Sequence, residues 1–376
     1  MCTTMKQSAI ANSKRLVIKI GSALLVHADG SLRETWLEAL AQDVANLRAK
    51  GTHVILVSSG AIALGCEVLK FKKRPDRLEE AQAAAAVGQI QLAQAYQTYF
   101  RAHDYTTAQL LLTLDDMENR PRYLNARNTV SELLEHGVIP VINENDTVAT
   151  SEIRFGDNDR LAARVAQMAS ADTLILLSDI NGLYDADPRD NKTAKLVSVV
   201  DAVTPEIEKM AGPPAQQGVG SGGMVTKIGA AKIALSGGCS MIIMNGEKNS
   251  PITRLTGGES CTIFNAGTNP LAVRKRWIQG MMAPKGFLHI DAGAVIALKR
   301  GASLLPAGVT DTLGNFDRGD LVAFIGPDGH TTGQGLISYN SLDAAKLQGQ
   351  NMRNADSILG YAGRSALVHR DDLVLL

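Results

Sequence analysis

Residues 15–22 read RLVIKIGS, a nearly unbroken apolar run that ends with a lysine, a glycine and a hydroxyl residue. Runs of this kind are typical of strands in parallel sheets, where both faces of the sheet are covered. Lys19 is unusual there, because a charged group near the end of a buried strand is costly unless an anion pairs with it. The alternative is an edge-strand lysine that reaches water. We favour the first interpretation, because Gly21 and Ser22 follow at once.

The same pattern recurs along the chain up to about residue 265. Short apolar runs alternate with longer segments of helical period, which is typical of βαβ units. The further strands are expected at HVILVS (53–58), TAQLLL (107–112), VIPVI (138–142), TLILLS (173–178) and SMIIMN (240–245). Helices are expected near residues 34–50, 78–102, 120–136, 158–169 and 223–236. The sequence therefore predicts an α/β fold, a three-layer αβα sandwich with a mostly parallel central sheet.

A second domain is expected at the C-terminal end. A chain of 376 residues exceeds what one hydrophobic core usually serves. After RKRW (274–277) the sequence changes to short runs separated by Gly, Asp and Pro, as in GFLHIDAGAVIAL and RGDLVAFIGPDG. This pattern favours small antiparallel strands and turns. We expect a catalytic domain over residues 1–275 and a small β-rich domain over residues 276–376.

The overall composition excludes several classes of protein. Apolar residues make up 45% of the chain, and 38 basic residues balance 38 acidic ones. The chain is thus too apolar for disorder, and its net charge draws it neither to nucleic acid nor to an anionic membrane. Its four cysteines form no C-x-x-C pair, which argues against a zinc site or a disulfide framework. No signal-like or membrane-spanning apolar stretch is present, so we expect a cytoplasmic protein.

Polar residues follow several of the predicted strands at their carboxyl ends. In open parallel sheets these ends share one crevice, where ligands bind and helix N-termini present positive potential. Four strand ends carrying such groups are difficult to attribute to solubility alone. The groups are Lys19 with Gly21 and Ser22, residues 58–61 (SSGA), residues 143–146 (NEND) and Ser178 with Asp179.

A glycine-rich turn precedes the last predicted helix. Residues 218–223 formally match G-x-G-x-x-G but follow no strand, so a dinucleotide-binding interpretation is weak. In residues 220–227 (GSGGMVTK), the glycines allow the backbone to approach a ligand closely. A helix N-terminus and a lysine on the same face follow, and this combination favours an anion site. The alternative is a surface loop that happens to precede a helix. With Lys19, Lys227 could clamp the β- and γ-phosphates of ATP in a phosphoryl transfer.

Residues 156–159 (GDND) precede another predicted helix. Helix capping could account for one of these polar residues, but three in a row exceed that need. Asn158 can donate and accept, so it could hold an amino-acid substrate. Asp157 and Asp159 could orient a lysine or coordinate Mg²⁺ directly or through water, and the sequence leaves both open as metal ligands. In the NEND loop, a substrate ammonium group would favour Asp146, with an ordinary polar loop as the alternative.

These stretches together resemble the amino acid kinase family, and within it the glutamate 5-kinases that carry a C-terminal PUA domain. The resemblance covers nearly the whole chain, and its motifs are specific in combination. The motifs are VIKIGSALL (17–25), VSSGAIALG (57–65), NARNT (125–129), VINENDTVAT (141–150), FGDNDRLAA (155–163), LLSDINGLYDADPR (176–189), GSGGMVTK (220–227), GASLLPAGV (301–309), GNFDRGDLV (314–322) and LGYAGRSALVHRDDL (359–373).

The resemblance implies roles for individual residues. It implies catalytic roles for Lys19, Lys227 and Asp159, with Asp159 organising the two lysines. It implies that ATP contacts Lys19, Ser178, Asp179, Ser221, Gly222, Gly223, Met224, Val225, Thr226 and Lys227. It implies that glutamate is held by Ser59, Asp146 and Asn158.

The resemblance further implies transfer of the γ-phosphoryl group of ATP to the side-chain carboxylate of L-glutamate, with Mg²⁺ bridging the phosphates. The product would be glutamate 5-phosphate, and the reaction the first step of proline biosynthesis. Members of the family are commonly homo-oligomers, dimers or tetramers, and are inhibited by proline.

Two alternatives stay open from the sequence. One is a sister kinase with another acceptor, such as N-acetylglutamate, aspartate, carbamate or a nucleoside monophosphate. The other is an RNA-binding or regulatory protein on an inactive kinase scaffold, since PUA domains elsewhere bind RNA. Residues 285–376 carry eight basic residues against nine aspartates, which offers little for phosphate contacts along a nucleic acid.

Overall fold

The structure is a computed structural model that describes residues 10–71, 73, 75–148, 158–212, 223–280 and 283–376. The chain divides into two compact units, Met1–Pro270 and Leu271–Leu376. The domain boundary expected at residues 275/276 falls within helix α12 (Pro270–Gly280), and it stays a prediction.

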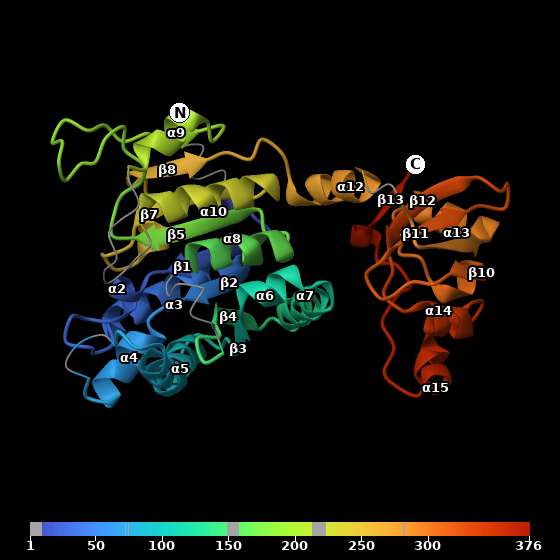
Figure 1. Cartoon of the computed structure of the whole chain (residues 1–376), viewed down its shortest axis with the longest axis horizontal. Helices are drawn as coiled ribbons and strands as arrows, with labels where there is room; N and C mark the ends of the chain where they lie inside the picture. Colours follow the sequence, from blue (N-terminus) through green and yellow to red (C-terminus); the bar gives the residue numbers. More distant parts are fainter. Residues whose placement is uncertain (1–9, 72, 74, 149–157, 213–222, 281–282) are drawn as a thin grey trace. The chain divides into compact units, whose positions relative to one another are not determined.

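The described part of the N-terminal unit contains an eight-stranded sheet of order β3-β4-β2-β1-β5-β7-β8-β6 (Figure 1). Neighbouring strands are parallel except β7 and β8, which are antiparallel. The mostly parallel sheet is therefore confirmed, and β6 and β8 were not predicted. The strands are β1 (Arg15–Ile20), β2 (His53–Ser58), β3 (Thr107–Leu112), β4 (Ile139–Glu144), β5 (Thr173–Ser178), β6 (Val199–Val200), β7 (Ser240–Asn245) and β8 (Cys261–Phe264).

Helices cover both faces of this sheet, which confirms the three-layer sandwich (Figure 1). One face packs on α3 (Glu34–Ala49), α4 (Ala61–Val68), α5 (Leu78–Arg101) and α11 (Pro251–Thr256). The other packs on α7 (Arg120–Glu135), α8 (Asn158–Met168) and α10 (Met224–Ser236). Three shorter helices, α2 (Ser22–Leu25), α6 (Leu114–Glu118) and α9 (Pro205–Met210), complete the unit.

The side-chain alternation of β1 determines where its lysine points. Leu16 and Ile18 belong to the hydrophobic cluster that contains α3 and α5, whereas Val17 belongs to the cluster that contains α8 and α10. Because successive side chains in a strand point to opposite faces, Lys19 lies on the same face as Val17. The lysine is thereby directed toward α8 and α10.

The C-terminal unit contains a five-stranded sheet of order β10-β9-β11-β12-β13 in its described residues. Its pairings are antiparallel except that of β9 with β11, which is parallel. A β-rich C-terminal region is therefore confirmed. The strands are β9 (Gly286–Ile290), β10 (Val309–Gly314), β11 (Leu321–Ile325), β12 (Thr331–Leu336) and β13 (Leu373–Leu375).

Helices also occur in this unit, and the sequence did not predict them. The run AGAVIALK, expected among strands and turns, forms helix α13 (Ala292–Lys299). The reason is a cap: the Asp291 side chain accepts a 2.7 Å hydrogen bond from the Ala294 N–H at the start of the helix. Two further helices are α14 (Ser341–Leu347) and α15 (Ala355–Leu359).

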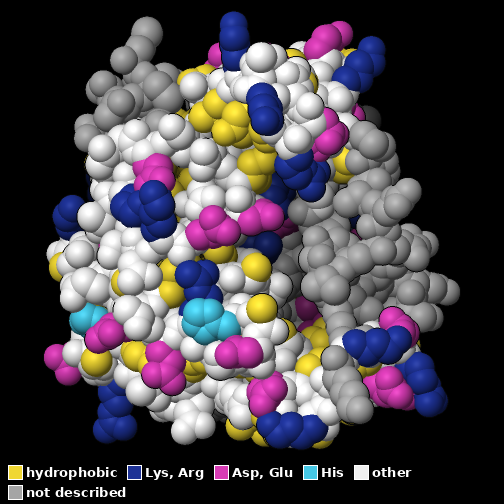
Figure 2. Space-filling view, turned by 90° about the vertical axis from the view of Figure 1, so that its left-hand side faces the viewer, with side chains coloured by type: hydrophobic (Ala, Val, Ile, Leu, Met, Phe, Trp, Pro, Cys, Tyr) yellow, Lys and Arg dark blue, Asp and Glu magenta, His cyan; other side chains and the backbone are white. Residues whose placement is uncertain are grey.

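Acidic and basic side chains are interspersed on the face of the molecule shown in Figure 2. Among the residues that the structure describes, no helix is long and apolar enough to cross a membrane.

Two glycines allow α4 and α5 to pack with their backbones in contact. A Cβ atom added at Gly88 would lie 1.8 Å from the Ala61 carbonyl oxygen, and one at Gly65 would lie 1.8 Å from the Ala84 carbonyl oxygen. Such distances are far below van der Waals contact, so no larger residue fits without moving a helix. The close crossing fixes the position of α5, and the start of α4 follows directly on the polar end of β2.

We predict that Gly88→Ala destabilises the N-terminal unit by about 1–3 kcal/mol, because the added methyl group overpacks this crossing. The control is Gly229→Ala in α10, whose added Cβ would meet only Arg160 Nε at 3.7 Å. This change should stabilise the unit by about 0.5–1 kcal/mol, as Gly→Ala does in a helix interior. Urea unfolding can be followed by the fluorescence of buried Trp36 in a Trp277→Phe background. Equal effects of the two changes would contradict the packing argument.

Candidate active site

A buried carboxylate lies between two lysines at the carboxyl edge of the sheet. Asp159 Oδ1 forms an ion pair with Lys19 Nζ at 2.8 Å, and Asp159 Oδ2 accepts a hydrogen bond from Lys227 Nζ at 2.9 Å. The three residues are 2%, 9% and 5% exposed for Asp159, Lys19 and Lys227, respectively, so all three are buried. The structure thus brings together the three residues for which the resemblance implied catalytic roles.

Three separate elements supply these side chains. Lys19 is the penultimate residue of β1, Asp159 lies in the first turn of α8, and Lys227 lies in the first turn of α10. Thr226 adds a second contact, since its Oγ1 donates to Asp159 Oδ2 at 3.2 Å. The same hydroxyl lies 2.8 Å from the Gly223 carbonyl oxygen, which ties the start of α10 to the carboxylate.

The charges of the lysines determine the ionisation of Asp159. Burial alone would raise the pKa of this carboxyl group, because desolvation disfavours the charged form. The positive charges of Lys19 and Lys227 and their hydrogen bonds outweigh burial and hold the pKa well below its usual range. Asp159 is therefore ionised at neutral pH. Two cations balanced by one carboxylate leave a net positive charge for an anionic ligand.

A second polar group lies beside the first, because Asn158 precedes Asp159 in the chain. Asn158 Nδ2 donates to the Ser58 carbonyl oxygen at 2.9 Å, to Ser59 Oγ at 2.7 Å and to Asn143 Oδ1 at 3.2 Å. Asn158 is 6% exposed, and its Oδ1 atom is buried without a hydrogen-bond partner in the described structure. A buried acceptor of this kind is costly to leave unpaired, so it suits a ligand donor such as an ammonium group.

Two buried side chains of α5 support this second group. Asn143 Nδ2 donates to Gln89 Oε1 at 2.8 Å, and the Tyr96 hydroxyl lies 2.9 Å from Ser58 Oγ. Sequence reasoning missed Gln89 and Tyr96. A weak signal was present, since Gln89 directly follows Gly88, a glycine inside a predicted helix.

The other predicted residues occupy the strand ends and the start of α10. Ser178 Oγ donates to Asp179 Oδ1 at 2.9 Å at the end of β5, the strand paired with β1. Asp146 lies half-buried in the turn after β4. At the N-terminus of α10, Met224 is half-buried and Val225 is exposed. Asp157, Ser221 and Gly222 lie outside the described residues.

The sequence left Asp157 and Asp159 open as ligands of a metal ion. In the described ranges, no group of three or more His, Cys, Asp or Glu side chains could hold a metal ion. Both carboxylate oxygens of Asp159 are engaged by ammonium groups. Asp159 is therefore the partner of the two lysines in this structure.

Two lysines held at the carboxyl edge of a parallel sheet, beside a helix N-terminus, form a site suited to an anionic ligand such as a phosphate. Residues 14–245 match the model of the amino acid kinase family, and residues 286–359 match that of the PUA domain. The chain belongs to the amino acid kinase family, and as a kinase it uses ATP as the phosphoryl donor.

The relatives show to which group within the family this chain belongs. The chain is 54% identical over 372 residues to a glutamate 5-kinase of Bradyrhizobium diazoefficiens, a match that covers 99% of this chain and 100% of that one. It is also 54% identical over 363 residues to a glutamate 5-kinase of Nitrobacter hamburgensis, with 96% of each chain covered. The chain is therefore a member of the glutamate 5-kinases.

Among solved structures, a UMP kinase from Ureaplasma parvum matches with a TM-score of 0.47 and 17% identity, covering 68% of this chain and 99% of that one. The assignment to the family rests on the sequence relatives.

We predict that Asp159→Asn destabilises the N-terminal unit by about 3–5 kcal/mol, because it removes the carboxylate charge that pairs with both buried ammonium groups. The difference from wild type should be constant from about pH 5 to pH 8. It should shrink as the pH falls below about 4, because a carboxylate with a lowered pKa stabilises the fold above the pKa of the unfolded chain and loses this contribution in acid. Urea unfolding at several pH values measures this difference. A difference that grows in acid would contradict the ion-pair account.

Proposed function

We propose that this chain transfers the γ-phosphoryl group of ATP to the side-chain carboxylate of L-glutamate, giving glutamate 5-phosphate in the first step of proline biosynthesis. A carboxylate oxygen attacks the γ-phosphorus, the bond to the bridging oxygen breaks, and ADP leaves. The observation that carries the proposal is the pair of lysines on Asp159 in a chain 54% identical to glutamate 5-kinases over nearly its full length.

Lys19 and Lys227 are proposed to hold the phosphates. Both ammonium groups are fixed by Asp159 before ATP binds, so little reorganisation is needed when charge develops on the transferring group. The N-terminus of α10, which begins at Met224, adds backbone N–H groups and positive potential. Ser178 and Asp179 at the end of β5, and Ser221 to Val225 before and within the start of α10, are proposed as further nucleotide contacts.

Ser59, Asn158 and Asp146 are proposed to hold glutamate. Support comes from the direct hydrogen bond between Asn158 and Ser59 and from the buried Asn158 Oδ1, which can accept from the α-ammonium group. Asp146 would add a carboxylate for the same ammonium group. Since Asn158 and Asp159 are adjacent, the acceptor and the phosphate clamp would meet at the start of α8, as an in-line transfer requires.

Mg²⁺ is proposed to arrive with ATP. This ion commonly binds through substrate phosphates, water and one or two carboxylates, so a dedicated protein cage is not required. When bound, it would neutralise charge that develops on the phosphates. The residues of this chain position the phosphates around it.

Regulation, assembly and location are part of the proposal on family grounds. We propose inhibition by proline at or near the glutamate site, assembly into homo-dimers or homo-tetramers, and a cytoplasmic location. Catalysis is assigned to residues 1–275. The rival function, an RNA-binding protein on an inactive scaffold, is disfavoured by the intact contacts of Lys19, Asp159 and Lys227.

The test is ATP- and Mg²⁺-dependent formation of an acyl phosphate, trapped as the hydroxamate with hydroxylamine. L-glutamate, N-acetylglutamate, aspartate and a nucleoside monophosphate control are compared, with and without proline. We expect turnover on glutamate that proline suppresses. Lys227→Ala should lower kcat by about 100-fold or more, because a preorganised cation is removed from the transition state.

Lys232→Ala is the matched control on the same helix, since Lys232 is paired with Glu208 at the surface. It should keep kcat within about twofold. Turnover on another acceptor would contradict the substrate assignment. An unchanged kcat in Lys227→Ala would remove Lys227 from the proposed phosphate clamp.

A further inference from the structure

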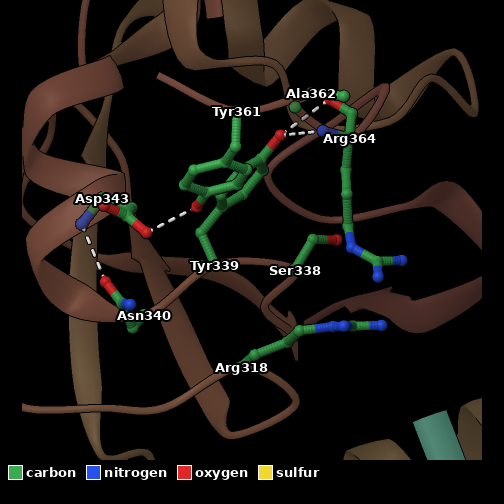
Figure 3. Close-up of a pocket in the computed structure, with 9 residues that line it drawn as sticks. Arg318, Ser338, Tyr339, Asn340, Asp343, Tyr361, Ala362 and Arg364 are labelled. Atoms are coloured by element: carbon green, nitrogen blue, oxygen red, sulfur yellow. Dashed lines mark hydrogen bonds between the residues drawn. The ribbon is translucent and has the colours of Figure 1, made fainter. Parts of the chain in front are cut away.

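The C-terminal unit contains a cavity of about 450 Å³ that the kinase reaction does not use. We call it the arginine pocket. Arg318, Ser338, Tyr339, Asp343, Tyr361 and Arg364 are among the residues that line it (Figure 3). Its volume lies within the range of sites that bind small organic molecules.

Two arginines lie on one side of this pocket. Arg318 precedes β11, and Arg364 lies in the loop after α15, yet their guanidinium groups come close together (Figure 3). Both residues are half-buried. Ser338 directs its hydroxyl group toward the same space (Figure 3). Two planar donors and a hydroxyl group thus converge from separate segments of the chain.

The position of Arg364 is fixed by the backbone around it. The Tyr339 hydroxyl group donates a 2.8 Å hydrogen bond to the Arg364 carbonyl oxygen and accepts one from the Arg364 N–H. Tyr339 itself is 3% exposed and belongs to the core of the unit. A buried residue therefore fixes the backbone from which the Arg364 side chain reaches the pocket.

The Asp343 carboxylate of the pocket already has partners of its own. Asp343 accepts a 2.6 Å hydrogen bond from the Tyr361 hydroxyl group and lies 3.7 Å from Lys346 Nζ. Across the described chain, Arg364 forms no ion pair with an acidic side chain. The pocket therefore keeps the positive charge of Arg364, which no acidic side chain of the described chain neutralises.

The pKa shifts of the two arginines are consistent with an anion site at this place. Burial lowers the pKa of Arg318, and the neighbouring charge of Arg364 lowers it further. Burial also lowers the pKa of Arg364. Two like charges in a partly desolvated cavity oppose each other, and an anion placed between them would remove that cost. Guanidinium groups favour phosphate in particular, because their fork of N–H donors matches its oxygens.

We propose that the arginine pocket binds the phosphate group of a small phosphorylated metabolite, through Arg318, Arg364 and Ser338. The volume of the pocket, about 450 Å³, favours a small ligand over a nucleic acid. RNA binding depends on many phosphate contacts along a surface, and residues 285–376 carry eight basic residues against nine aspartates. The pocket concentrates two cations at one point, which suits a single phosphate monoester.

The experiment is equilibrium dialysis of the full chain against radiolabelled inorganic phosphate and, separately, ribose 5-phosphate. Arg364→Gln and Arg318→Gln each remove one charge and keep a shorter, uncharged polar side chain. We expect each to weaken one binding event by about 10- to 100-fold, the loss typical of a charge-assisted contact. Any phosphate bound at the kinase site is the same in all variants, so the difference reports the pocket alone.

Arg353→Gln is the matched control, because Arg353 is an exposed arginine of the same unit. It should leave phosphate binding unchanged. Ser338→Ala makes a smaller change, should weaken binding several-fold, and serves as the test if an arginine variant fails to fold. Equal binding by wild type and all three pocket variants would overturn the proposal. A second result would also overturn it: displacement of phosphate by a single-stranded RNA without terminal phosphates, if this RNA binds more tightly than phosphate and its binding depends on Arg364.

Discussion

The buried carboxylate of Asp159 between the ammonium groups of Lys19 and Lys227 is the interaction on which the kinase unit depends. None of the three charges could be buried alone, because each would lose its hydration without compensation. Their presence together requires β1, α8 and α10 to meet at one point. The parallel sheet meets this requirement, since it places the end of a central strand beside the N-termini of helices on one face.

The start of α8 contacts both polar groups of the site. Asn158 and Asp159 are consecutive at the start of α8, one bonded to the end of β2 and the other to the lysines. Movement of this helix would therefore disturb the proposed acceptor side and the proposed phosphate side together. Gln89 and Tyr96 of α5 contact Asn143 and Ser58 on the proposed acceptor side from the opposite layer. Phosphoryl transfer needs such positioning more than it needs a covalent group on the protein.

Much of this could be predicted from local sequence patterns. The six apolar runs predicted the main strands, and Lys19 stood out because it ends a buried run. The hydrogen bonds of Asn158 and the support from Gln89 could not be predicted, because they join residues 15 to 100 positions apart. Helix α13 was missed because β-branched residues hid its helical period, while its cap at Asp291 decided the outcome. For Asp157, Ser221 and Gly222 the roles stay predictions.

The most direct measurement is a crystal structure of the protein with L-glutamate, Mg²⁺ and a non-hydrolysable ATP analogue. The central claim is that one carboxylate holds both lysines as a ready-made phosphate clamp. The account predicts that Lys19 Nζ and Lys227 Nζ each lie about 2.7–3.2 Å from β- or γ-phosphate oxygens while both remain bonded to Asp159. A complex in which either lysine leaves Asp159, or contacts no phosphate, would contradict it.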